Sequence, residues 1–250
     1  MKIEVVTLFP ELIQLGLKFG VLGRAIERGI VSVGCEDPRA HTRDVHRTVD
    51  DRPYGGGPGM VLKPEPMSMA IDAAAGRTPQ GSPRIYVSAQ GVPFCQALAR
   101  EFSKLPALTL VAGRYEGLDE RVIESRIDRE VSVGDYVLSG GEFPALVIID
   151  AVVRLLPNVL GDDRSAVEES FDSGLLDWPH YTRPVEFEGR TVPEVLAGGH
   201  HADIQRWRLK QAVARTWMRR PDLIARGGLP ADAAKLLDEF LAEREGERHD

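Results

Sequence analysis

The sequence predicts an α/β protein, with a parallel-sheet domain followed by a smaller and mainly helical domain. Short strand-like runs alternate with helical patterns over roughly the first 160 residues, which is typical of layered α/β structures. The strand candidates are continuous apolar runs, as expected where helices cover both faces of a parallel sheet. Beyond residue 175 the strand-like runs give way to longer helical patterns that are punctuated by prolines.

Four strands and four helices are expected in the first domain. Each strand candidate is a short apolar run rich in residues that favour strands. These runs cover residues 3–9, 85–89, 108–113 and 131–134. Each helix candidate repeats apolar residues every three or four positions. These patterns cover residues 11–29, 65–76, 94–105 and 143–157.

The chain changes character after the last of these helices. Residues 158–175 are polar, acidic and poor in periodicity, which is typical of a linker. Two helical patterns follow, at 203–220 and 231–245, and a proline at a helix-start position precedes the second. The sequence therefore predicts a sheet domain at 1–160, a linker at 161–175 and a helical domain at 176–250.

The composition is that of a soluble globular chain. Hydrophobic residues make up 43% and charged residues 28%, which excludes disordered and fibrous proteins. No apolar run is long enough to span a bilayer, and the first residues lack a signal-peptide pattern. The only cysteines, Cys35 and Cys95, are too few for a disulfide framework and indicate a cytoplasmic location. The net charge of −7 argues against bulk nucleic-acid binding but permits a local basic patch.

Three strand candidates run directly into glycine-rich turns, within residues 85–91, 108–117 and 131–142. Ligands of open α/β sheets bind outside the carboxyl ends of the strands, and glycine lets the backbone approach a ligand closely. The turns therefore predict a site for a flat heterocycle, unless each glycine only turns the chain. No G-x-G-x-x-G follows a strand and residues 55–60 lack the G-K-[ST] of a Walker A loop, so neither nucleotide site is expected.

Two segments carry enough basic residues to contact RNA. The loop at 39–60 has four arginines, whose guanidinium groups suit phosphate. The helical pattern at 203–220 places Arg208, Arg215 and Arg219 near one face, beside an apolar stripe. Either segment is alternatively a solvated surface with internal ion pairs. The six histidines show no ligand spacing, so no metal site is expected.

Several long motifs together resemble one family. They read HRTVDDRPYGGGPGM at 46–60, GRYEGLDERV at 113–122, VGDYVLSGGEFP at 133–144, GLLDWPHYTRP at 174–184 and WRLKQAVARTWMRRPDL at 207–223. In this order they resemble the bacterial tRNA (guanine-N1)-methyltransferases, the TrmD family. The resemblance implies an enzyme that uses S-adenosylmethionine to methylate N1 of guanosine 37 in tRNA. It also implies a deep trefoil knot of the SPOUT type and a homodimer with shared active sites that binds the anticodon arm.

The same resemblance places the S-adenosylmethionine pocket on the three glycine-rich turns. It implies contacts from Tyr86, Val87, Ser88, Gly113, Tyr115, Glu116, Val133, Gly134, Asp135, Tyr136, Val137, Leu138, Gly140, Gly141 and Pro144. Magnesium is implied for methyl transfer by the family alone, since the sequence shows no ligand set for it.

Two further residues are implied for the chemistry. The N1 proton of guanine must leave, which requires a general base near N1 and favours an arginine near O6. Arg154 matches the family's arginine, although its spacing from Asp150 also fits an intrahelical ion pair. Glu169 stands where the family has an aspartate, and its extra methylene moves the carboxylate by roughly 1 Å. Glu168 and Asp172 are alternative bases, and a catalytically weakened RNA-binding relative is the alternative function.

Overall fold

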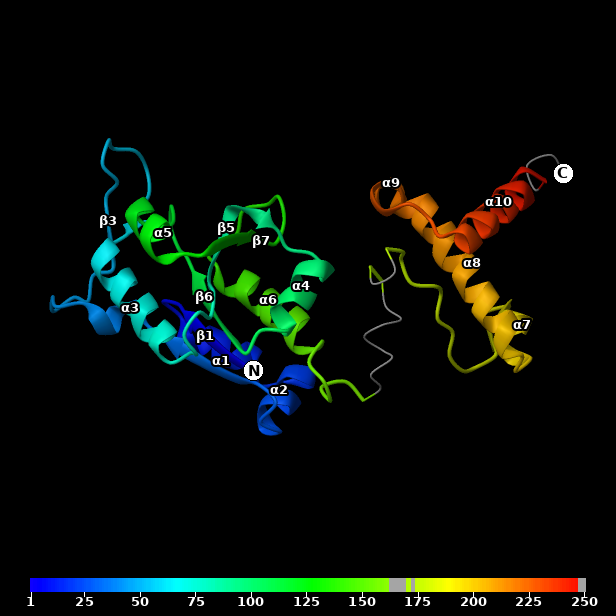
Figure 1. Cartoon of the computed structure of the whole chain (residues 1–250), viewed down its shortest axis with the longest axis horizontal. Coiled ribbons are helices and arrows are strands. Elements are labelled where there is room, and N and C mark those ends of the chain that lie inside the picture. Colours follow the sequence, from blue (N-terminus) through cyan, green and yellow to red (C-terminus); the bar gives the residue numbers. More distant parts are fainter. Residues whose placement is uncertain (162–169, 172–173, 247–250) are drawn as a thin grey trace. The chain divides into compact units, whose positions relative to one another are not determined.

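The structure is a computed structural model of the chain and describes residues 1–161, 170–171 and 174–246. The chain divides into two compact units, Met1–Asp163 and Arg164–Asp250 (Figure 1). We call them the N-terminal unit and the C-terminal unit. Among the described helices, none combines the length and the apolar composition that a membrane span requires.

A five-stranded parallel sheet forms the centre of the N-terminal unit (Figure 1). In spatial order its strands are β2 (Ser32–Glu36), β1 (Lys2–Val6), β6 (Ala107–Ala112), β5 (Arg84–Pro93) and β7 (Arg129–Ser132). The parallel sheet and its four predicted strands are therefore confirmed. The edge strand β2 was not predicted, because its half-buried sequence SVGCE lacks the apolar character of the central strands.

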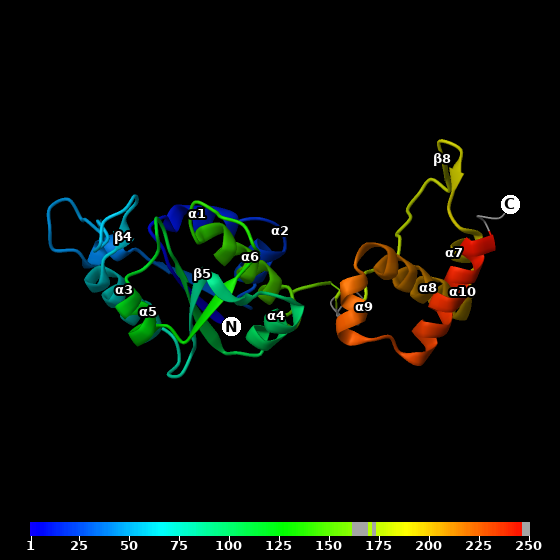
Figure 2. The same cartoon turned by 90° about the horizontal axis from the view of Figure 1, so that it is seen from above.

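Helices cover both faces of this sheet (Figures 1 and 2). One face carries α1 (Pro10–Gly16), α2 (Gly20–Glu27), α4 (Gln96–Ser103) and α6 (Glu142–Val153). The other face carries α3 (Pro64–Gly76) and α5 (Glu120–Arg126). Ile85 and Val87 join the first cluster of buried side chains and Tyr86 joins the second, because successive strand residues point to opposite faces. Burial on both faces explains why the strands are apolar throughout.

The prediction of one continuous helix at 11–29 is wrong. α1 and α2 are separate because Phe19 is extended and Gly20 has a φ of 65°, a left-handed conformation that glycine adopts readily. The helix α5 and several short elements also escaped prediction, because so few residues carry little periodicity. These short elements are η1 (Pro38–His41), β3 (Asp50–Asp51) and β4 (Val61–Leu62).

The C-terminal unit is built mainly from helices. Its elements are β8 (Glu186–Phe187), β9 (Arg190–Thr191), α7 (Glu194–Ala197), α8 (His201–Arg219), α9 (Pro221–Gly227) and α10 (Ala231–Gly246). The core of the unit joins Leu175 to Ala212 and Val213 of α8 and to Ala233 of α10. The β8–β9 hairpin projects away from these helices (Figure 2).

Candidate active site

The three glycine-rich turns meet at one edge of the parallel sheet. They belong to β5, β6 and β7, which are neighbours in the sheet, and the carboxyl ends of parallel strands share one edge. Between the turns lies a cavity of about 240 Å³. The predicted residues that line it are Tyr86, Val87, Ser88, Gly113, Tyr115, Glu116, Val133, Gly134, Tyr136, Val137, Leu138, Gly140, Gly141 and Pro144. Asp135 is predicted for the pocket but does not line the cavity.

Five residues that were not predicted also line the cavity. They are Ala89, Gln90, Arg114, Gly117 and Ser132. The first two lie where β5 has an irregular register rather than an ordinary turn, so the strand continues beyond its predicted end. Arg114 and Gly117 lie inside the motif GRYEG, so the motif itself was the available signal for them.

Gly141 brings two of the turns into backbone contact. Its N–H donates to the Gly113 carbonyl at 2.8 Å. A Cβ atom at position 141 would lie 2.7 Å from the Cα of Ala112, whereas unstrained carbon atoms approach to about 3.5–4.0 Å. The turns can therefore meet in this way only if position 141 carries no side chain.

The side chain of Tyr86 packs against the second turn. Its side chain is buried, and a Cβ atom at Gly113 would lie 2.7 Å from the phenol oxygen. Burial raises the pKa of Tyr86 above its ordinary value. A tyrosine phenol is protonated at neutral pH even at its ordinary pKa, so this one can act as a hydrogen-bond donor at the cavity wall.

The arginine-rich loop at 39–60 ends beside the cavity. The Glu116 N–H donates to the Met60 carbonyl at 3.0 Å. Gly59 has a φ of 88°, and a Cβ atom there would overlap the Glu116 side chain. The first and second motifs, which are far apart in sequence, are thus neighbours at the rim of the site.

Arg154 lies far from this cavity within its own chain. Helix α6 begins beside the cavity at Glu142, and Arg154 follows its last residue, Val153. Twelve helical residues with a rise of ~1.5 Å each separate the two ends by roughly 18 Å. Glu169, Glu168 and Asp172, the predicted base and its alternatives, lie outside the described residues.

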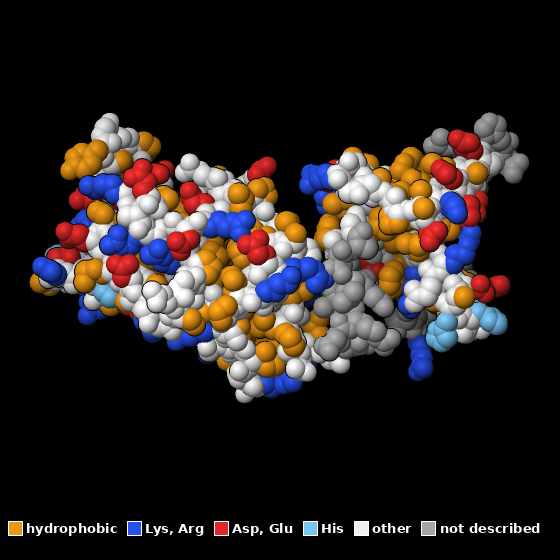
Figure 3. Space-filling model, viewed as in Figure 1, with side chains coloured by type: hydrophobic (Ala, Val, Ile, Leu, Met, Phe, Trp, Pro, Cys, Tyr) orange, Lys and Arg blue, Asp and Glu red, His pale blue; other side chains and the backbone are white. Residues whose placement is uncertain are grey.

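An exposed apolar surface surrounds Arg154. Phe143 and Val147 of α6 are about half exposed, and Phe19 before α2 is 72% exposed. A groove of about 590 Å³ is lined by Phe143, Val147, Leu146 and Arg154, among others. In the space-filling view, apolar side chains lie among Lys and Arg side chains over this part of the N-terminal unit (Figure 3). Large apolar patches of this kind mark interaction surfaces.

The cations of α8 fall into two groups. Arg206 donates to Glu239 at 2.7 Å and Lys210 to Glu243 at 2.6 Å, so both are neutralised by α10. Arg220, just after the helix, pairs with Asp222.

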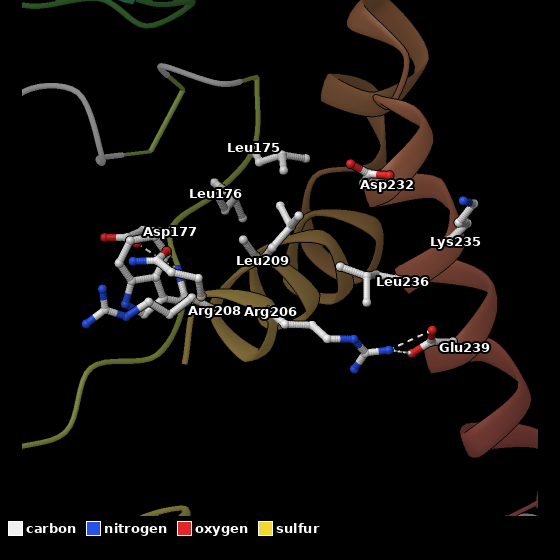
Figure 4. Close-up of a pocket in the computed structure, with 13 residues that line it drawn as sticks. Leu175, Leu176, Asp177, Arg206, Arg208, Leu209, Asp232, Lys235, Leu236 and Glu239 are labelled. Carbon is white, nitrogen blue, oxygen red and sulfur yellow. Dashed lines mark hydrogen bonds and ion pairs between the residues drawn. The ribbon is translucent and has the colours of Figure 1, made fainter. Parts of the chain in front are cut away.

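The predicted RNA-binding arginines form the other group. Arg208 points away from α10 (Figure 4) and stacks on Trp178 at 4.8 Å. Within the part of the chain that the structure describes, Arg208, Arg215 and Arg219 form no ion pair with a carboxylate. The face predicted to contact RNA is therefore the one that keeps its positive charge.

A larger cavity, of about 550 Å³, lies in the C-terminal unit between α8 and α10 (Figure 4). Leu175, Leu209 and Leu236 line it, and the ion pair between Arg206 and Glu239 closes one side. Leu175, Leu209 and Ala212 of its lining belong to the core of the unit, and this ion pair already satisfies two of its charged groups. We therefore place the candidate active site at the strand ends, where the polar turns converge.

Comparison with known proteins shows the family of the chain. The family model described as tRNA (Guanine-1)-methyltransferase TrmD matches residues 1–226. Among similar proteins, a tRNA (guanine-N(1)-)-methyltransferase of Methylococcus capsulatus is 57% identical, with 98% of each chain covered. Proteins with the same description from Coxiella burnetii and Cronobacter sakazakii are 53% and 52% identical, covering 96% and 100% of this chain and 98% and 97% of their own. The chain therefore belongs to the TrmD family of tRNA (guanine-1)-methyltransferases.

Proposed function

We propose that the protein is an S-adenosylmethionine-dependent methyltransferase that modifies N1 of guanosine 37 in tRNA. The observation that carries the proposal is the cavity at the strand ends, which collects nearly all the residues that the family resemblance implies for the methyl donor. Relatives described as tRNA (guanine-N(1)-)-methyltransferases, which match almost the full chain, support the same reaction.

The cavity suits a flat, polar ligand held by backbone groups. Glycines at positions 113, 140 and 141 leave N–H and C=O groups of the turns open to close approach. The volume of about 240 Å³ is below the ~300–1,000 Å³ typical of ligand pockets. Val137, which lines the cavity, is 96% exposed, so the cavity is open to solvent there and a larger ligand can extend beyond this volume. When bound, S-adenosylmethionine supplies an electrophilic methyl group.

We assign proton removal from N1 to Glu169 and charge stabilisation at O6 to Arg154. A carboxylate within hydrogen-bond reach of N1 accepts the proton as the methyl group is transferred. The fixed positive charge of a guanidinium stabilises the negative charge that develops on O6. The longer side chain of Glu169 requires its backbone to lie roughly 1 Å further from the base than an aspartate would.

The active site is proposed to be shared between two chains of a homodimer. Arg154 lies roughly 18 Å along α6 from the cavity of its own chain, which is too far to act on a base bound there. The exposed apolar surface around Arg154 supplies a face for the second chain. In a homodimer that uses this face on both chains, each Arg154 could act at the partner's cavity instead of its own.

The tRNA anticodon arm is proposed to contact the unpaired face of α8 and the loop at 39–60. Arg208, Arg215 and Arg219 offer three cations without carboxylate partners among the described residues. Phosphate contacts supply affinity and orient the RNA, while the cavity selects the base. Local patches of this kind are compatible with a net charge of −7, because the remaining surface is acidic.

The knot, the domain division and the cytoplasmic location belong to the same proposal. The knot is proposed from the family resemblance. A Cβ atom at Gly91 would overlap the backbone of Val131, so glycine at this position lets the irregular part of β5 pair closely with β7. The proposed domains are 1–160 and 176–250, joined by the linker 161–175. Within the described ranges, no group of three or more His, Cys, Asp and Glu side chains could hold a metal ion, so we assign no residue to magnesium.

Position-resolved mass spectrometry of tRNA tests the proposed function. Unmodified transcripts are incubated with the protein and S-adenosylmethionine, with and without magnesium, and then digested. We expect one methyl group at N1 of guanosine 37, and none on a transcript with another nucleotide at that position. If the wild-type protein binds the transcript but transfers no methyl group, the glutamate at position 169 favours the second candidate, an RNA-binding relative without catalysis.

A further inference from the structure

A fully buried carboxyl group lies directly behind the cavity. Glu142 is 0% exposed and is the first residue of α6. Its Oε1 atom accepts a hydrogen bond from the Thr7 hydroxyl at 2.8 Å. Its Oε2 atom forms an ion pair with Nε of Arg114 at 2.9 Å, although this contact does not have the geometry of a hydrogen bond. Glutamate is almost never fully buried without a partner. The proposed reaction makes no use of this group.

Arg114 connects the buried carboxyl group to both walls of the cavity. It belongs to the second turn, and its Nη1 atom donates to the Ser139 carbonyl of the third turn at 3.0 Å. A Cβ atom at Gly140 would overlap its side chain. Its guanidinium also lies 4.4 Å from the ring centre of Phe9. The arginine is therefore held from three sides and fixes the gap between the two turns.

Thr7, the residue that follows β1, holds Glu142 in this position. Its hydroxyl oxygen donates to Glu142 and also accepts from the Phe9 N–H at 3.0 Å. The chain from Thr7 through Glu142 to Arg114 thus anchors both turns to the residue that follows β1. Because removing one partner of a buried pair leaves the other unpaired, the chain acts as a unit.

A second buried carboxylate that pairs with an arginine in the same unit has no such connection. Glu4 is 2% exposed, and its Oε2 atom lies 2.8 Å from Nη2 of Arg77. Neither residue lines the cavity. Loss of either pair should lower the stability of the fold. Only loss of the pair behind the cavity, Glu142 and Arg114, should also change the geometry of the turns.

We propose that Glu142 is a positioning residue for the methyl donor, acting through Arg114 on the spacing of residues 113–117 and 134–141. The proposal rests on the proposed function, because it places the cofactor between these turns. Without the carboxylate, Arg114 turns toward solvent and releases the Ser139 carbonyl. The turns then separate, and a displacement of ~1 Å at a reacting site costs roughly 10²-fold.

Glu142→Gln tests the proposal against Glu4→Gln as a matched control. Both replace a buried, arginine-paired carboxylate with an amide of the same size. We expect both to lower the melting temperature. Only Glu142→Gln should weaken S-adenosylmethionine binding, at least roughly tenfold by calorimetry, and raise KM for the cofactor more than it lowers kcat. In an Arg114→Gln background, Glu142→Gln should have little further effect on cofactor affinity, since the arginine carries its influence.

Amide hydrogen exchange without cofactor separates this proposal from the proposed function. We expect faster exchange over residues 134–141 in Glu142→Gln and unchanged exchange there in Glu4→Gln. If Glu142→Gln does not fold, Arg114→Gln carries the same expectation, because its side chain is not part of the core. Unchanged exchange in a folded variant, or equal loss of cofactor affinity in both glutamate variants, would overturn the positioning role. Failure of the wild-type protein to bind S-adenosylmethionine would instead contradict the proposed function.

Discussion

Replacing Gly141 with alanine tests the cavity with the smallest possible side chain. The new Cβ atom would lie 2.7 Å from the Cα of Ala112 and 2.9 Å from the amide nitrogen of Gly113. Both are backbone atoms, so no side chain can rotate away to make room. Ordinary contact at about 3.5–4.0 Å is restored only if the third turn moves roughly 1 Å from the end of β6.

That displacement sets the size of the expected effect. A misplacement of ~1 Å at an active site costs roughly 10²-fold, and overpacking costs about 1–3 kcal/mol of stability. We therefore expect Gly141→Ala to weaken S-adenosylmethionine binding by roughly 10–100-fold, which corresponds to about 1.4–2.8 kcal/mol. The protein should still fold, with a melting temperature lower by several degrees.

Titration calorimetry of the folded variant with S-adenosylmethionine measures this effect. Gly76→Ala is the matched control, because it adds the same methyl group at the end of α3 with no atom within 4 Å and no strained φ. The control should bind the cofactor as tightly as the wild type. A folded Gly141→Ala protein with wild-type affinity would refute the assignment of the cavity.

Three further predictions address the base, the RNA surface and the cysteines. Glu169→Gln should lower methyl transfer at least ~10²-fold in single-turnover assays, with cofactor affinity unchanged, because it removes the proton acceptor. Neutralising both Arg208 and Arg215 with glutamine should weaken tRNA binding and reduce the slope of log Kd against log salt by roughly 1.4–1.8, since fewer counterions are released. Burial raises the pKa of Cys35 to about 11, so iodoacetamide at pH 8 should label Cys95 first, as read by peptide mass spectrometry.

Each of these predictions has an outcome that contradicts it. Near-normal turnover of Glu169→Gln would mean that a neighbouring acid, and not Glu169, accepts the proton. For the RNA surface, the control is a double variant with glutamine in place of Arg206 and Lys210. It removes the same charge, but from residues that already pair with carboxylates of α10. Equal salt slopes for the two double variants would mean that the unpaired face is only solvated. Equal labelling of the two cysteines would contradict the burial of Cys35.

Much of the N-terminal fold follows from local sequence pattern. β6, residues 107–112, is buried along its whole length, so its apolar run identifies it without knowledge of its neighbours. The helix break at Gly20 escaped prediction, because the apolar periodicity continues across it and only the backbone conformation reveals it. β2 was missed for the opposite reason, since an edge strand is exposed enough to tolerate polar residues.

The part of the candidate site that lies within the sequence motifs was predictable. Nearly all the residues of the turns face one cavity, because turns at neighbouring parallel strands converge. Asp135 was implied by the family resemblance but does not line the cavity, because a turn presents only some of its side chains to one side. The sequence did not identify Glu142 as a site residue, since a glutamate that follows two glycines is typical of a solvent-exposed helix N-terminus. Its burial depends on Thr7 and Arg114, which are distant in sequence.

Activity of a mixed dimer tests the shared active site most directly. One chain carries Gly141→Leu, which blocks the cavity, and the other carries Arg154→Ala, and different affinity tags allow the mixed dimer to be purified. One of its two sites combines an intact cavity with an intact Arg154 from the partner, so we expect about half of the wild-type methylation at guanosine 37, while both parent homodimers stay far below it. A mixed dimer that native mass spectrometry verifies but that transfers no methyl group would contradict the shared site, because cavity and arginine would then act within one chain.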